Sequence, residues 1–496
     1  MLDLDQSQRD AIGLNFVLSH LTPDSPYGMK KKKQLAPFAR NERQELGECF
    51  HNISQAINVV QNNEDAFNEC RRLLMSLNNI RGIVRKCEAS YLHEVELFEV
   101  KKFLLLLEKL TLVFTDISRG ANFEGISLKK MDDALFILDP DGVRLSPFSI
   151  DNRSSPALAK IRRDKACLEA RLRELDADTN KNEWDDINNR RFLLAQQEEA
   201  EETLVMKQLS AALRVHVDDF YHNMESIGVL DLIIAKALLA IRFEGIRPRI
   251  NNGERVYLEQ MSNPHVADEL ERRGKSFTKI SVEIKRGVTL ITGANMGGKS
   301  VALKTAALNV ALCQLGLFVF ARDAEMPLFD GIRFLCGDLQ DSRLGLSTFG
   351  AEILCLKEIA ATLKTKFLFI ALDEFARGTN PEEGAAIVRA VASYLSASQS
   401  ICLMTTHYDR IASPKFSHYR IAGLTKAAYE ILEKKLPMME IEQNGERGID
   451  LVAEHMDYTL VETTGKTTPS RDAMNICKLI GLDKDIIDKI ESQLVP

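Results

Sequence analysis

The segment Gly-Ala-Asn-Met-Gly-Gly-Lys-Ser at 293–300 constrains the fold of this 496-residue chain more than any other feature. Its pattern, G-x-x-x-x-G-K-[ST], forms a loop whose backbone N–H groups face the phosphates of a nucleotide. An apolar run at 288–291 precedes it and predicts a strand, and the pattern over 298–315 predicts a helix. The positive N-terminal end of that helix also favours phosphate. A glycine-rich turn without a ligand is the weaker interpretation, because it explains neither neighbour.

The residue types in this segment predict its contacts with ATP. Lys299 is expected to reach the β- and γ-phosphates, and the Ser300 hydroxyl to ligate Mg²⁺. The residues expected to bind the nucleotide here are Gly293, Ala294, Asn295, Met296, Gly297, Gly298, Lys299, Ser300 and Val301.

A second apolar run, 367–372, ends in the two carboxylates Asp373 and Glu374. A carboxylate at the tip of such a strand holds Mg²⁺ in P-loop enzymes, directly or through water, so Asp373 is the predicted metal ligand. Glu374 is then the candidate that polarises the attacking water. Two solvated acids at a strand end are common. The roles predicted for Asp373 and Glu374 therefore depend on the phosphate-binding loop (P-loop) at 293–300 of the same chain.

Two further polar residues are candidates on weaker grounds. His407 follows the next apolar run, 401–405, and is a candidate sensor of the γ-phosphate, although a His at a strand end usually bonds a backbone group. Ser347, in Gly-Leu-Ser-Thr-Phe-Gly-Ala-Glu at 345–352, stands where a helix is expected to begin, and such an end favours anions. A simple helix cap explains Ser347 equally well.

The N-terminal half of the chain predicts helices. Apolar residues recur three and four positions apart over 1–135, and the apolar residues 136–138 before a turn sequence predict a short strand. Ser155 and Pro156 then predict the cap and first position of a helix over 157–178. The apolar seam of this helix consists of Leu158, Ile161, Leu168, Leu172 and Leu175.

Polar residues 176–189 are expected to turn the chain, and a second helix from about 190 to return along the first. A projecting arm and two surface helices of a bundle are equally compatible with this pattern. We expect three parts: a helical domain over 1–135, a helical hairpin with a return to that domain over 136–245, and a third domain over 246–496.

The third part alternates strands with helices. Strands are predicted at 288–291, 367–372 and 401–405, and helices at 298–315 and 381–395. Such alternation predicts an α/β fold with a mostly parallel sheet covered by helices.

Composition excludes several other classes of protein. The net charge is −7, so charge alone gives no hint of nucleic acid. Lys30 to Lys33 could bind phosphate backbone, but a solvated helix face is the favoured interpretation. The nine cysteines show no C-x-x-C spacing, which argues against zinc and favours small core residues. No basic leader and no apolar run of about 18 residues is present, so we expect a cytoplasmic protein without membrane contact.

The motifs, taken in order, resemble those of the MutS family. GANMGGKS is similar to its Walker A segment, LSTFGAE to its signature loop, LDEFARGTNPEEG to its Walker B strand and following loop, and TTHYD to its His-bearing segment. Weaker similarity extends outward from 280–410 over nearly the whole chain.

The resemblance implies an ABC-type P-loop ATPase domain preceded by an all-α core and a lever domain. It further implies a homodimer, or a heterodimer with a MutS-like paralogue, whose subunits complete each other's sites. Ser347 would touch the γ-phosphate held by the other subunit's Lys299, and Phe277 would stack on adenine. Residues 377–380 (Arg377, Gly378, Thr379 and Asn380) would communicate across the interface.

The sequence also departs from the family pattern. We expect the mismatch-reading N-terminal domain and a C-terminal nuclease-like extension to be absent. Phe67-Asn68-Glu69 has the letters of the mismatch wedge but is predicted to be a surface helix turn. The DNA-gripping clamp of the lever is replaced by the short turn near 176–189.

Two hypotheses remain open for the client, that is, the molecule on which the chain acts with the energy of ATP. One is a MutS-like ATPase that works on double-stranded DNA in mismatch repair or recombination. The other is a protein-remodelling ATPase, similar to the MutS-like reactivases of cobalamin-dependent lysine 5,6-aminomutase and ornithine aminomutase. Both hypotheses require the same ATP site.

Overall fold

In the computed structural model, the residues that the structure describes are 3–145, 148–150, 152–175, 181–293, 298–336, 348–377, 379–408, 411, 413–424, 426–435, 452, 454–463, 474, 477–478 and 482–493. They form two compact units. One contains residues 1–21, 35–54 and 236–496, and the other contains residues 22–34 and 55–235. The chain therefore passes between the units several times, and the division into three sequential domains stays a prediction.

The unit formed by residues 22–34 and 55–235 is built from helices. They are α3 (Pro26–Lys33), α5 (Glu64–Met75), α6 (Arg81–Ala89), α7 (Glu94–Gly120), α8 (Asp132–Leu138), α9 (Pro156–Glu174), α10 (Lys181–Arg214) and most of α11 (Val217–Arg242). The strand predicted at 136–138 is wrong, since these residues end α8. Ala134, Leu135 and Leu138 are buried and Phe136 is exposed, which is helical spacing rather than strand alternation.

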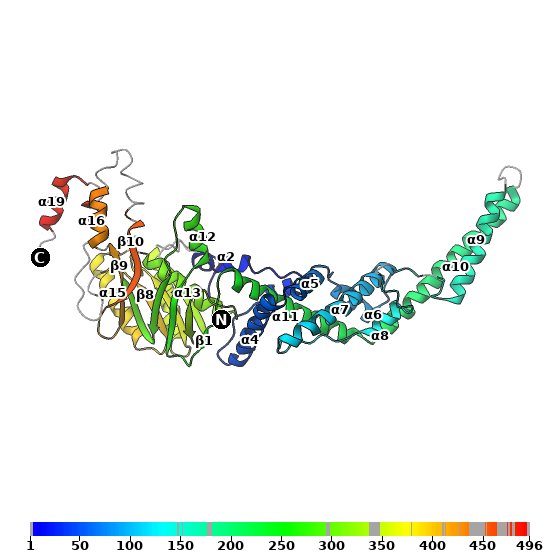
Figure 1. Cartoon of the computed structure of the whole chain (residues 1–496), viewed down its shortest axis with the longest axis horizontal. Coiled ribbons are helices and arrows are strands. Elements are labelled where there is room, and N and C mark those ends of the chain that lie inside the picture. The colour runs from blue at the N-terminus through cyan, green and yellow to red at the C-terminus, as the bar shows by residue number, and fades with distance from the viewer. Residues whose placement is uncertain are drawn as a thin grey trace. The chain divides into compact units, whose positions relative to one another are not determined.

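The predicted start of the helix pair is confirmed, and of the predicted seam Leu158 is buried in a cluster with Val205 of α10, whereas Leu175 lies beyond the end of α9. The Ser155 side chain accepts a hydrogen bond from Leu158 N, and Pro156 is the first residue of α9. Figure 1 shows α9 and α10 running side by side. The predicted turn was too long, because α9 ends at Glu174 and α10 begins at Lys181. The polar residues from Lys181 onward form the exposed start of a helix, which Arg171 of α9 supports by pairing with Glu183.

The segment Phe67-Asn68-Glu69, which matches the sequence of the mismatch wedge, lies in helix α5, as predicted. The side chain of Phe67 is buried, however, so this is not a surface turn. Residues 30–33 end helix α3, where Lys31 pairs with Glu225 at 2.6 Å. Among the cysteines, Cys70, Cys87, Cys313, Cys336 and Cys402 are buried as core residues, whereas Cys167 is exposed on α9.

The other unit contains two sheets. The six-stranded sheet has the order β10-β9-β4-β8-β7-β6, in which β4 (Gly287–Thr292), β6 (Gly331–Cys336), β7 (Leu368–Asp373), β8 (Ile401–Thr405) and β9 (Ser417–Leu424) are parallel and β10 (Met456–Glu462) is antiparallel to β9. The four-stranded sheet has the order β1-β5-β2-β3, from β1 (Arg249–Ile250), β5 (Asp323–Met326), β2 (Arg255–Met261) and β3 (Ile280–Lys285).

The unit that contains the two sheets also contains helices (Figure 1). They are α1 (Gln6–Ala11), α2 (Leu14–Ser19), α12 (Pro264–Arg272), α13 (Lys299–Gln314), α14 (Thr348–Thr362), α15 (Pro381–Ser396), α16 (Lys426–Lys435) and α19 (Lys484–Gln493), and α4 (Arg43–Asn62) begins in this unit. The predicted fold class is confirmed: a helical region precedes an α/β region with a mostly parallel sheet. No helix in the described residues combines the length and apolarity that crossing a membrane requires.

The topology brings three chain segments to one edge of the sheet. Strands β4, β8 and β7 are neighbours, and their register pairs Ile291 with Thr405 and Leu372 with Met404. Because the strands are parallel, their carboxyl ends meet at the same edge. The residues that follow β4, β7 and β8 in the sequence are therefore neighbours in space.

Candidate functional site

The loop after β4 is described at both of its ends. Gly293 has a φ of 145°, and Gly298, directly before α13, has a φ of 83°. Side chains other than glycine are strained at such positive φ angles, so both glycines are required by the backbone path. Ala294, Asn295, Met296 and Gly297, as well as Ser347 and Gly378, lie outside the described residues.

Lys299 is the first residue of α13 and is almost fully buried. Its Nζ donates a hydrogen bond to Gly293 O at 2.8 Å and lies 3.5 Å from Glu374 Oε1. Burial lowers the pKa of the Lys299 ammonium, because a charge is costly in a low dielectric. The nearby Glu374 carboxylate opposes this shift, and a nucleotide phosphate in the loop would also stabilise the charged form.

A hydrogen-bond network joins the start of α13 to the ends of β7 and β8. Ser300 Oγ donates to Asp373 Oδ1 at 2.8 Å, and Thr405 Oγ1 donates to the same oxygen at 2.7 Å. Thr405 Oγ1 in turn accepts from Glu374 N at 2.9 Å. The network fixes Asp373 beside Ser300, across 73 residues of sequence.

The pair of Ser300 and Asp373 fits a magnesium ion. Both offer oxygen, and their oxygens are close enough to share one ion's coordination shell. Mg²⁺ is usually bound through one or two protein oxygens plus water and substrate phosphates, rather than by a cage of protein ligands. No cluster of three or more His, Cys, Asp or Glu that could hold a metal is present among the described residues.

Glu374 lies directly after β7, in a turn with a φ of 46°. Its carboxylate contacts two cations, Lys299 Nζ at 3.5 Å and Arg377 Nη1 at 3.0 Å. The Glu374 side chain is 13% exposed, whereas that of Arg377 is 66% exposed. The Glu374 carboxylate is therefore mostly buried beside Lys299 at the start of α13, with a small exposed part that a water molecule can reach.

His407 is exposed two residues beyond β8, beside the buried Tyr408. Thr406 N donates to Ile291 O at 3.2 Å, so this segment lies next to the end of β4. Arg377 and Asn380 were expected to communicate between subunits. Arg377 is exposed, and the Asn380 side chain caps α15 by accepting a hydrogen bond from Glu382 N. This cap is a contact within one subunit, so the role of Asn380 between subunits stays a prediction.

A cavity of about 440 Å³ adjoins the start of α13. Phe277, Gly298 and Val301, all candidates for nucleotide contact, line it together with Tyr458 of β10. The full lining is Val266, Leu270, Gly274, Lys275, Ser276, Phe277, Thr278, Ile280, Gly298, Val301, Glu454, Met456 and Tyr458. The volume lies within the range of small-molecule sites, about 300–1,000 Å³. The place of this cavity supports Phe277 as the base-stacking candidate.

Sequence patterns missed Thr405, Tyr458 and His418 in and around this site. Thr405 was visible only as the last residue of an apolar strand. His418 is buried between Thr292 Oγ1, 2.7 Å from Nε2, and Thr463 Oγ1, 2.9 Å from Nδ1. Burial lowers the pKa of His418, so the neutral imidazole that ties β9 to the end of β4 is favoured.

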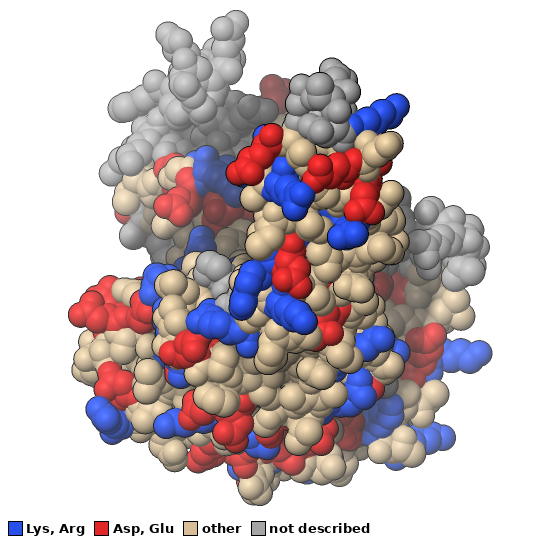
Figure 2. All heavy atoms as spheres, turned by 90° about the vertical axis from the view of Figure 1, so that its right-hand side faces the viewer, with Lys and Arg blue, Asp and Glu red and all other residues tan. Residues whose placement is uncertain are grey.

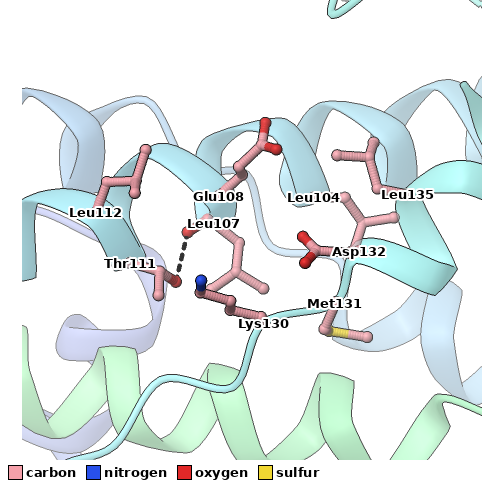
Figure 3. Close-up of a pocket in the computed structure, with 9 residues that line it drawn as sticks. All are labelled: Leu104, Leu107, Glu108, Thr111, Leu112, Lys130, Met131, Asp132 and Leu135. Atoms are coloured by element: carbon pink, nitrogen blue, oxygen red, sulfur yellow. Dashed lines mark hydrogen bonds between the residues drawn. The ribbon is translucent and has the colours of Figure 1, made fainter. Parts of the chain in front are cut away.

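Another cavity lies in the helical unit, between α7 and the segment 130–135 (Figure 3). Its volume is about 190 Å³, which is small for an organic ligand. Two of its polar groups already have partners: Thr111 Oγ1 donates to Leu107 O at 2.8 Å, and Glu108 pairs with Arg144 at 3.0 Å. It gives no indication of a second ligand site.

Residues 289–449 match the family described as MutS domain V. The chain is similar to Endonuclease MutS2 of Caldicellulosiruptor saccharolyticus, with 32% identity over 231 residues that cover 46% of this chain and 28% of that protein. It is similar to DNA mismatch repair protein MutS of Thermus aquaticus, with 37% identity over 206 residues that cover 40% of this chain and 24% of that protein.

A longer similarity extends into the helical part. Endonuclease MutS2 of Caldanaerobacter subterraneus subsp. tengcongensis is 24% identical over 423 residues, which cover 72% of this chain and 52% of that protein. The matches thus span between about a quarter and about half of the length of these relatives.

Proposed function

We propose that this chain binds ATP with Mg²⁺ and hydrolyses it between Gly293 and His407, since residues 289–449 match MutS domain V, an ATPase domain. The observation that carries the proposal is the meeting of Lys299, Ser300, Asp373 and Glu374 at one sheet edge. These four residue types have the roles of a P-loop hydrolase: a phosphate cation, two magnesium ligands and a carboxylate for water.

The residues divide the reaction between them. Lys299 holds the β- and γ-phosphates, and its desolvated charge favours the negative charge that spreads over the transferred phosphoryl group. Ser300 and Asp373 would hold Mg²⁺, which neutralises phosphate charge when bound. Glu374 orients the attacking water and accepts its proton, and the exposed His407 is a further candidate to orient the γ-phosphate.

We also propose that the working form is a dimer with shared sites. Ser347 of one subunit would then contact the γ-phosphate at Lys299 of the other. ATP would stabilise the closed dimer because it contacts both subunits in that state only.

A mixing experiment tests the shared sites. A Lys299→Ala subunit keeps its Ser347, and a Ser347→Ala subunit keeps its P-loop, so only the mixed dimer has one complete site. Each variant alone should be nearly inactive. An equal mixture should recover roughly a quarter of wild-type phosphate release, since about half of randomly paired dimers are mixed and each has one of two sites. A mixture no more active than its separate components would argue against shared sites.

The first candidate for what the chain does with the energy of ATP hydrolysis is work on double-stranded DNA. It is suggested by the relatives' printed names, Endonuclease MutS2 and DNA mismatch repair protein MutS. Those names apply to proteins that this chain matches over only part of their length.

A protein client is the second candidate, and the α9–α10 hairpin favours it. Two of its cations are paired with carboxylates: Arg162 with Glu198 and Glu202, and Lys165 with Glu198. Figure 2, which faces the α9–α10 side, shows acidic and basic side chains intermixed. Phe192 and Leu193 of α10 are more than half exposed, an apolar feature suited to protein contact. The short connection between α9 and α10 also leaves no room for an inserted clamp.

The two clients predict different binding. We expect weak binding to linear duplex at physiological salt, about 0.15 M, without preference for a mismatch, because the chain has a net charge of −7 and Arg162 and Lys165 of the hairpin are already paired with carboxylates. We expect ATP to change the affinity for a protein, and purified cobalamin-dependent lysine 5,6-aminomutase, inactivated by turnover, is the probe. Recovery of its activity with ATP, and not with a Lys299→Ala variant, would support the second candidate. Tight, structure-selective DNA binding in a gel-shift titration would instead favour repair.

A further inference from the structure

Glu374 occupies an unusual turn that needs outside support. Both Glu374 and Ala376 have positive φ angles, 46° and 64°. Non-glycine residues held in sparsely populated backbone regions cost about 1–3 kcal/mol each and persist only where surrounding contacts hold them. The contacts that hold this turn therefore decide where the Glu374 carboxylate points.

Two side chains from different elements bond the backbone of Ala376. Glu352 of α14 accepts a hydrogen bond from Ala376 N through its Oε2 at 2.9 Å. Tyr408, beyond β8, donates its hydroxyl hydrogen to Ala376 O at 2.8 Å. Glu352 is 4% exposed and Ala376 is 0% exposed, so no water competes for these bonds. The two bonds fix both sides of one residue, two positions after Glu374.

A third element closes around the same point. A Cβ at Gly384 of α15 would lie 2.1 Å from the Tyr408 hydroxyl and 3.2 Å from Ala376 O. Glycine at this position therefore leaves the space that the Tyr408 hydroxyl fills. Helices α14 and α15 and the segment after β8 all converge on Ala376.

Burial of the Glu352 carboxyl is costly. Desolvation raises the pKa of Glu352, while the hydrogen bond from Ala376 N opposes the shift. Burial also raises the pKa of the Tyr408 hydroxyl, with the nearby Glu352 as a second cause. An apolar side chain would fill the position at a lower desolvation cost. The carboxyl group therefore indicates that Ala376 N needs a hydrogen-bond acceptor at this place.

We propose that Glu352 and Tyr408 are positioning residues for ATP hydrolysis, which hold the turn after β7 so that Glu374 faces the attacking water. The proposal rests on the proposed function of Glu374. It also links α14, which Ser347 directly precedes in the sequence, to the hydrolytic carboxylate through the Glu352 bond.

The test compares single-turnover ATP hydrolysis and ATP-analogue binding in matched variants. Glu352→Ala removes the acceptor, while Glu352→Gln keeps an oxygen that can accept from Ala376 N. We expect Glu352→Ala to slow hydrolysis by about 10–100-fold, the scale of a misplacement near 1 Å, with affinity within about twofold of wild type. Glu352→Gln should keep most of the rate. Tyr408→Phe removes only the hydroxyl and should also slow hydrolysis.

A double variant separates positioning from general damage to the fold. If Glu352 acts through Glu374, adding Glu352→Ala to Glu374→Gln should cause no further loss, whereas independent effects would multiply. Multiplied losses, equal losses in Glu352→Ala and Glu352→Gln, or wild-type rates in both Glu352→Ala and Tyr408→Phe would overturn the proposal. Should Glu352→Ala fail to fold, Tyr408→Phe alone and combined with Glu374→Gln carries the same test. If Glu374→Gln itself keeps wild-type hydrolysis, the assignment of Glu374 fails first and this proposal fails with it.

Discussion

Purified Lys299→Ala protein should lose ATP binding while keeping its fold. Lys299 Nζ is buried at the start of α13 and bonded to Gly293 O, at the opening of the phosphate loop. Removing one partner of a buried charge pair costs about 2–5 kcal/mol, which corresponds to a loss in affinity of roughly 30-fold or more. Isothermal titration with a non-hydrolysable ATP analogue measures the loss directly.

Lys304→Ala is the matched control for this variant. Lys304 lies on the same helix but is only half-buried and belongs to the next turn. It should bind the analogue as wild type does. Circular dichroism of both variants checks that the helical content is unchanged. Wild-type affinity in Lys299→Ala would remove the residue from the phosphate site.

Glu374→Gln should bind ATP normally and hydrolyse it at least about tenfold more slowly. The substitution keeps the shape of the side chain and removes the charge that polarises water. Losses of a general base typically lower rates by about 10²–10⁴-fold. The comparison requires two measurements on one preparation: analogue affinity by titration and the rate of phosphate release under saturating ATP.

Glu383→Gln, in the exposed first turn of α15, controls for removing a nearby negative charge. Its rate should equal that of wild type. If Glu374→Gln also turns over at the wild-type rate, the base lies elsewhere, and His407 becomes the next residue to substitute.

The central strands and the P-loop helix were predictable from the sequence. Strand β8 has the predicted bounds 401–405, and β4 and α13 differ from prediction by a residue or two at their ends. Such strands are buried on both faces and flanked by helices, so they appear in the sequence as continuous apolar runs of strand length. The P-loop pattern then fixed where the helix begins.

Elsewhere the sequence pattern was insufficient because the deciding contacts are not local. The polar start of α10 resembles a turn until its pairing with α9 is known. Glu352 bonds Ala376 across 24 residues, and Ser300 bonds Asp373 across 73. No periodicity encodes such bonds, since they exist only when the strands have been ordered in the sheet. The α8 segment was mistaken for a strand because three apolar residues in a row fit either structure.

Phosphate release by the wild-type chain, measured beside Lys299→Ala purified in the same way, tests the central claim most directly. The claim is that this chain hydrolyses ATP at the site between Gly293 and His407. It predicts release that saturates with ATP, requires Mg²⁺ and disappears in Lys299→Ala. Equal release by the two proteins, or none from the wild type at saturating Mg²⁺ and ATP, would contradict it.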